Sequence, residues 1–143
     1  MNTRLRLAAL AAVFTLLTPT LRAQVPQFVN YQGRVAVGTT NYNGSGQFKF
    51  ALVNADGTTT YWSNDGTSVS GREPNQTVSL NVSRGSDSGL LGDTTLSNRT
   101  AIAPAVLTNA NTILRLWFNN GSAGFQPLAP DQRLGATAFA LIA

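Results

Sequence analysis

The residues of this chain that could carry out acid–base chemistry are six carboxylates and one lysine, because the chain contains neither histidine nor cysteine. Without histidine it lacks the most common general base and transition-metal ligand. Without cysteine it lacks thiolate chemistry and the usual ligands of structural zinc. Any catalysis would therefore depend on carboxylates and hydroxyl groups. The carboxylates are Asp56, Asp65, Glu73, Asp87, Asp93 and Asp131.

The spacing of these acids does not favour catalysis or metal binding. Two carboxylates can hydrolyse a glycosidic bond when they lie roughly 5–10 Å apart, but Asp56 and Asp65 each precede a glycine, as in tight turns. The segment DSGLLGD at 87–93 offers two acids, whereas calcium loops need several oxygen ligands at fixed offsets. The sequence therefore predicts no enzyme, no cofactor and no metal site, and a hydrolase built on Asp and Ser or Thr is the least favoured interpretation.

Residues 1–23 have the pattern of an export signal. Two arginines precede an apolar run at 7–17, which is too short to span a bilayer as a helix. Pro19 follows, and the stretch ends in the small residue Ala23. A signal peptidase recognises this order. We therefore expect a signal-peptide helix, its removal, and a single secreted or surface-held domain at 24–143.

The charge of the predicted domain argues against nucleic acid as a partner. The whole chain has a net charge of +4, but three of its basic residues lie in the predicted signal. The remaining seven basic and six acidic residues give a net charge of about +1 and are spread along the chain. Nucleic-acid binding needs clustered Lys and Arg. The domain also has no second apolar run long enough to span a membrane.

The elements that must position these residues are predicted to be strands. Residues 47–54 alternate between apolar and other side chains, the period of a half-buried strand. Residues 112–119 are apolar on both faces, as in a central strand. Further elements are strands at 25–37, 58–63 and 77–83, loops at 38–46 and 84–89, a short helical turn within 101–106, and a proline-bracketed stretch followed by a small-residue tail within 125–143. The pattern predicts an all-β fold, a single antiparallel β-sandwich of the jelly-roll or Ig-like kind with about seven or eight strands.

Three aromatic residues are candidates for contact with a ligand or glycan: Tyr61, Trp62 and Trp117. Exposed aromatic rings on a β-sandwich can stack on sugars. Buried rings instead fill the core and find a partner for their polar atom. The position of Trp117 in the most apolar strand favours the core.

The order of several segments resembles a module found near the N-terminus of exported bacterial surface and fibre-like proteins. The first and last segments, FVNYQGRV at 28–35 and LAPDQRLGATAFALIA at 128–143, are the most specific. They resemble the "NYQGR" opening and the "P-x-QR…YA-x-A" closing of that module. The resemblance implies no catalytic residues. It suggests that Arg34 and Arg133 brace the terminal strands through hydrogen bonds to backbone carbonyls or to Asp131.

These observations predict a secreted, non-catalytic structural or adhesive module of the bacterial cell surface. It would act by association with copies of itself, for example as a fibre, or with a surface protein or glycan. The edge strand near 28–37 and the tail at 136–143 are the predicted places for strand addition. The alternative is a carbohydrate-binding module that uses the exposed aromatics.

Overall fold

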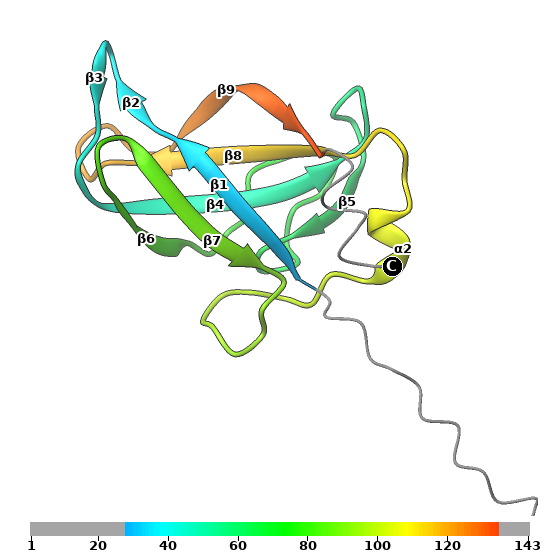
Figure 1. Cartoon of the computed structure of the whole chain (residues 1–143). Helices are drawn as coiled ribbons and strands as arrows, with labels where there is room; N and C mark the ends of the chain where they lie inside the picture. The colour runs from blue at the N-terminus through cyan, green and yellow to red at the C-terminus, as the bar shows by residue number, and fades with distance from the viewer. Residues whose placement is uncertain (1–27, 135–143) are drawn as a thin grey trace, which may run out of the picture.

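The computed structural model describes residues 28–134, and these form an all-β chain, as the sequence predicts. The predicted signal peptide and the tail at 136–143 lie outside the described residues. The strands are arranged in a sandwich-like manner, with a two-stranded ribbon over a larger sheet (Figure 1). The elements are β1 (Val29–Arg34), β2 (Ala36–Val37), β3 (Thr40–Asn41), β4 (Gly44–Val53), β5 (Thr60–Ser63), β6 (Val78–Val82), β7 (Ser86–Leu91), α2 (Pro104–Leu107), β8 (Ile113–Asn119) and β9 (Gln126–Arg133).

The larger sheet has five strands built around β4 and β8. Its order is β5-β4-β8-β9, and β6 pairs with the first half of β4. The antiparallel register of β4 and β8 runs from Gln47 opposite Asn119 to Val53 opposite Ile113. The strand predicted at 112–119 is therefore central in this sheet, which explains why both of its faces are largely buried.

The main core lies between this sheet and the antiparallel ribbon of β1 and β7. In the ribbon, Val29 pairs with Leu91 and Arg34 with Ser86. Alternate residues of β4 and β8 point toward the ribbon, and burial of their apolar surface is the main driving force that holds the two layers together. The buried residues include Val29, Tyr31 and Leu91 of the ribbon and Phe48, Phe50, Leu52, Leu114, Leu116 and Phe118 of the sheet.

The opposite face of the sheet is also covered. Ala51, Val53 and Trp117 form a second apolar cluster there. Lys49 shares this face, and it is only 7% exposed. Its ammonium lies 2.6 Å from a carboxylate oxygen of Glu73 and 4.2 Å from the centre of the Phe125 ring. A buried charge of this kind is tolerated because it is paired.

The prediction of a loop at 84–89 is wrong for most of that segment, because Ser86–Leu91 is strand β7. Arg84 and Gly85 have φ values of 51° and 80° and form the tight turn from β6 into β7. The turn is two residues long, so pairing resumes at once. The core face of β7 carries Asp87 and Gly89 in place of apolar residues, so the strand lacks the alternation by which it could be recognised. The loop predicted at 38–46 likewise contains β3 and the start of β4.

Strand β9 occupies the proline-bracketed stretch, for which no strand was predicted. It pairs with β8 at the edge of the sheet, where Pro127 and Pro130 are tolerated because an edge strand need not donate every hydrogen bond. The predicted helical turn is confirmed as α2, which begins at Pro104, a favourable position for proline. Among residues 28–134, no helix has the length and apolar character needed to cross a membrane.

Candidate functional site

Three of the six carboxylates act within local turns. Asp56, Asp65 and Asp93 each accept hydrogen bonds from the backbone N–H and the hydroxyl of the threonine two residues later. At Asp56 the Thr58 hydroxyl and N–H lower the pKa of the carboxyl. These contacts confirm the turns predicted at Asp56 and Asp65. The three acids therefore have structural roles.

Asp65 also fixes a distant segment. One of its carboxylate oxygens accepts the Gln76 N–H at 2.6 Å. Partial burial acts to raise the pKa of Asp65, but the hydrogen bonds from Thr67 and Gln76 outweigh it and lower the pKa. The ionised form is favoured because it accepts several donors at once.

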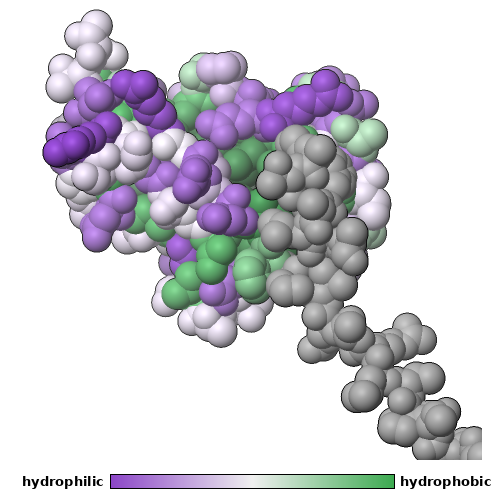
Figure 2. All heavy atoms as spheres, in the orientation of Figure 1, coloured by the Kyte–Doolittle hydropathy of each residue, from purple (hydrophilic) through white to green (hydrophobic). Residues whose placement is uncertain are grey.

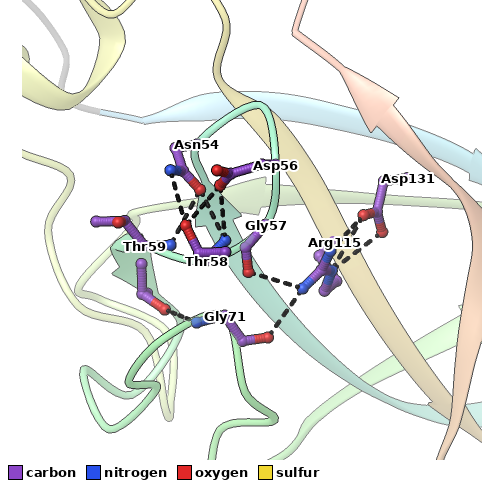
Figure 3. A network of polar contacts seen from close by, with 9 residues as sticks. Asn54, Asp56, Gly57, Thr58, Thr59, Gly71, Arg115 and Asp131 are labelled. Atoms are coloured by element: carbon purple, nitrogen blue, oxygen red, sulfur yellow. Dashed lines mark hydrogen bonds and ion pairs between the residues drawn. The ribbon is translucent and has the colours of Figure 1, made fainter.

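Asp131 is held by Arg115, which extends from the central strand β8 (Figure 3). The Nε and Nη2 atoms of Arg115 donate to the Asp131 carboxylate at distances from 2.7 to 3.2 Å. Its Nη1 donates to the carbonyls of Gly57 and Gly71 at 3.3 and 3.1 Å. The carboxylate raises the pKa of Arg115. One guanidinium thus joins the sheet edge to two loops, and its donors are committed to internal partners.

Arg34 and Arg133 have partners other than the predicted ones. Arg34 donates to the side-chain oxygen of Asn41 at 3.1 Å, and Arg133 donates to that of Asn111. Asp131 instead accepts the two-pronged contact from Arg115. The contacts still connect each terminal strand to another segment, and bracing of those strands stays a prediction.

The three candidate aromatics are not equally accessible. Trp62 is 7% exposed, and its indole N–H donates to the Thr100 carbonyl at 3.1 Å. Trp117 is also 7% exposed and packs in the second apolar cluster. Tyr61 is 36% exposed. Of these three candidates only Tyr61 presents its ring to solvent, while both indoles fill the interior.

Tyr61 lines an open pocket of about 340 Å³. Its polar lining consists of Asn54, Asp56, Asn109 and Asn111. The last two residues come from the connection between α2 and β8, and sequence reasoning missed them because no local pattern relates this connection to Tyr61. An aromatic ring beside amide and carboxylate groups is chemically suited to a sugar, which has both apolar faces and hydroxyl groups.

The structure also brings together two buried polar side chains, Asp87 and Tyr31, inside the β1–β7 ribbon, and the sequence did not indicate this pair. Asp87 and Tyr31 are 5% and 4% exposed, and neither the Tyr31 hydroxyl nor the Asp87 carboxylate makes a hydrogen bond of acceptable geometry. A Cβ on Gly33 would lie 1.6 Å from the Tyr31 hydroxyl and 2.9 Å from Asp87 Oδ1. Gly33 therefore makes the room that both groups occupy.

Burial changes the protonation of this pair. It raises the pKa of Asp87, an effect that the nearby Tyr31 hydroxyl opposes in part. Burial, with the charge of Asp87, also raises the pKa of Tyr31. Both shifts favour the uncharged forms, because a low-dielectric site penalises an unpaired charge.

Residues 28–134 contain no group of three or more Asp, Glu, His or Cys side chains that could hold a metal ion. No family model, curated protein or solved structure matches the chain. A proposal about function therefore depends on the fold and on the three local features described above: the edges of the sheets, the Tyr61 pocket and the Asp87–Tyr31 pair.

Proposed function

We propose that this chain is a secreted, non-catalytic structural or adhesive module of a bacterial cell surface, and that it associates with copies of itself through the outer edge of β1. The observation that carries the proposal is the pairing of β1. Among the described strands, β1 pairs only with β7, so one row of its backbone groups is open to a further strand. Strand addition at such an edge is a common mode of association.

The edge of β1 lacks the features by which proteins usually prevent this pairing. Strand β9, an edge strand of the larger sheet, carries Pro127, Pro130 and two charged residues. Strand β1 has no proline, and its only charge is Arg34. Proline and charge are the usual protections of an edge, so β1 is the less protected of the two.

Exposed apolar side chains near β1 also support association. Phe28, just before β1, is 38% exposed, and Val37, in β2, is 47% exposed. On the ribbon side of the molecule, Figure 2 shows hydrophobic areas among hydrophilic and neutral ones. An added strand would cover part of this apolar surface. The carboxylates support a non-catalytic role, since five of them bond to internal partners and Asp87 is buried.

Charge placed on the β1 edge is expected to abolish self-association. The test uses the full chain, expressed with its own N-terminus in a bacterial host and recovered after export. The intact mass of the recovered chain also reports whether residues 1–23 are removed. Light scattering and negative-stain imaging are expected to show oligomers or fibres. The double variant Asn30→Lys/Gln32→Lys is expected to be monomeric at concentrations roughly 100-fold above those at which the wild-type chain associates, because like charges would face each other across the new strand pair.

A matched control places the same charges on the β9 edge of the larger sheet. Gln126→Lys/Gln132→Lys alters two exposed residues of β9 and is expected to leave association unchanged. If the β9 variant loses association and the β1 variant keeps it, the contact lies elsewhere. A wild-type chain that remains monomeric at all concentrations would contradict self-association.

A second candidate function is carbohydrate binding at the pocket of Tyr61, which is favoured by the exposed ring and its polar surroundings. The exported chain would be screened against a panel of immobilised glycans. For any glycan that binds, Tyr61→Ala is expected to weaken affinity about tenfold, since loss of one aromatic contact costs on the order of 1 kcal/mol. Tyr61→Phe keeps the ring and is expected to bind within about threefold of wild type. Equal binding by Tyr61→Ala and wild type would exclude this pocket.

A further inference from the structure

We propose that Asp87 and Tyr31 form a proton-dependent latch between the β1–β7 ribbon and the five-stranded sheet, which is closed while Asp87 is protonated and is weakened when Asp87 ionises. Asp87 belongs to β7 and pairs in register with Gly33 of β1. Both oxygens of its carboxyl group are buried without a hydrogen-bond partner. An ionised carboxylate in this position would lose its hydration, and the nearby Tyr31 hydroxyl and Asp87 backbone would offset that loss only in part.

No positive charge is placed to compensate Asp87. The titratable groups on the adjoining elements are Tyr31 and Arg34 on β1 and Arg84 in the β6–β7 turn. Arg34 is bonded to Asn41, and Arg84 is exposed. Strand β6 carries no charged residue. The two ion pairs among the described residues, Lys49 with Glu73 and Arg115 with Asp131, do not include Asp87.

The face of the sheet that packs against the ribbon is also without charge. Strand β4 contributes Phe48 and Phe50 to the core shared with the ribbon, and strand β8 contributes Leu114, Leu116 and Phe118. Lys49 lies between the two phenylalanines in β4 and therefore points to the opposite face, where Glu73 neutralises it. The surroundings of Asp87 are thus uncharged: they consist of apolar side chains of the sheet, the neutral Tyr31 hydroxyl, and polar residues that line a pocket beside it, among them Asn81, Ser83 and Ser86.

The direction of the pH effect follows from this burial. Burial raises the pKa of Asp87 in the folded chain, so the folded state binds this proton more tightly than the unfolded chain does. Its contribution to stability is complete below the pKa of an unfolded aspartate, about 3.9, and is lost as the pH rises through the folded pKa. The latch is therefore strongest in acid. It does not depend on self-association, since it concerns the packing of one chain.

The test compares Asp87→Asn, which cannot ionise, with the wild-type exported chain between pH 4 and 9. Thermal unfolding is expected to show similar midpoints near pH 4 and a growing advantage of Asp87→Asn as the pH rises. At pH values above both pKa values, the ratio of folded to unfolded chain is expected to differ about tenfold for each unit by which the folded pKa exceeds the unfolded one. Asp56→Asn is the matched control, because Asp56 is exposed and its pKa is lowered. The unfolding midpoint of Asp56→Asn is expected to differ from that of wild type by a constant amount above pH 5.

Hydrogen exchange locates the effect. Peptides covering 29–34 and 86–91 are expected to exchange faster in wild type than in Asp87→Asn at pH 8, and equally at pH 4, while peptides from β4 and β8 show a smaller difference. Tyr31→Phe removes the hydroxyl that opposes the rise in the Asp87 pKa. Its stability is therefore expected to begin to fall at the same pH as in wild type, which the unfolded aspartate sets, and to reach its plateau at a higher pH. A constant difference between wild type and Asp87→Asn at every pH would overturn the proposal, as would an equal change in exchange throughout the sheet.

Discussion

Asn64→Ala is expected to destabilise the chain by roughly 3–5 kcal/mol, because each buried polar group left without a partner costs about 1–3 kcal/mol. The Asn64 side chain is fully buried. Its oxygen accepts the Phe50 N–H at 2.9 Å, and its nitrogen donates to the carbonyls of Gln76 and Asn98 at 2.9 and 3.2 Å. Removing the amide leaves the buried Phe50 N–H unpaired and takes the donor from two partly buried carbonyls. Denaturant unfolding of wild type and variant measures the loss.

Two further variants test whether the hydrogen bonds are the cause. Asn75→Ala changes an exposed asparagine of the loop that Asn64 anchors and is expected to cost less than about 0.5 kcal/mol. Asn64→Asp keeps the acceptor for Phe50 but, when ionised, places a negative charge against two carbonyl oxygens. It is expected to be at least as unstable at neutral pH as Asn64→Ala. If Asn64→Asp retained wild-type stability at pH 7, the two donated bonds would have no stabilising role.

The sequence was sufficient for the centre of the fold. Alternation at 47–54 located β4, and apolar residues on both faces at 112–119 located β8. Both strands contribute large buried apolar side chains to the core. The Asp-Gly turn at Asp56 also located the hairpin to β5. These features are local, and each is visible within a few residues of the chain.

The ribbon and the sheet edge could not be located in the same way. Strand β7 presents Asp87 and Gly89 to the interior and only Leu91 as an apolar residue there, so its core face lacks a recognisable apolar pattern. Strand β9 is exposed along most of its length and contains two prolines. Strand β7 forms because β1, distant in sequence, provides its hydrogen-bond partners, and β9 forms because it pairs back on β8. Such pairing depends on tertiary context, which overrides local propensity.

The candidate sites show the same limit. Asn64 reads as a turn residue before Asp65 and Gly66, yet its side chain joins β4 to two loops distant in sequence. Tyr31 reads as an ordinary apolar position of β1, and only the cross-strand register brings it beside Asp87. The type of each residue was visible in the sequence, but the partner that gives it a role was not.

Phe50→Ala is expected to cost about 3–5 kcal/mol and to weaken both layers of the fold, as is usual for a fully buried aromatic ring. Phe50 is 1% exposed. Its ring meets the edge of Tyr31 in the ribbon at 5.4 Å between centroids and stacks on Phe48 of its own strand at 6.0 Å. Truncation would leave a cavity between the layers, because close-packed neighbours can collapse into it only in part.

Phe50→Leu fills part of that cavity and is expected to recover more than half of the lost stability. Phe125→Ala removes a partly buried ring from the other face of the sheet and is expected to destabilise the chain less than Phe50→Ala. Chemical denaturation would rank the three variants, and a loss below about 1 kcal/mol for Phe50→Ala would contradict this packing.

Hydrogen exchange of Phe50→Ala gives a second expected result. Because Phe50 contacts Tyr31 directly, its truncation is expected to expose β1 and β7 to exchange before β4 and β8. The ribbon would then be the first part of the fold to open, which is the behaviour that a latch at Asp87 requires.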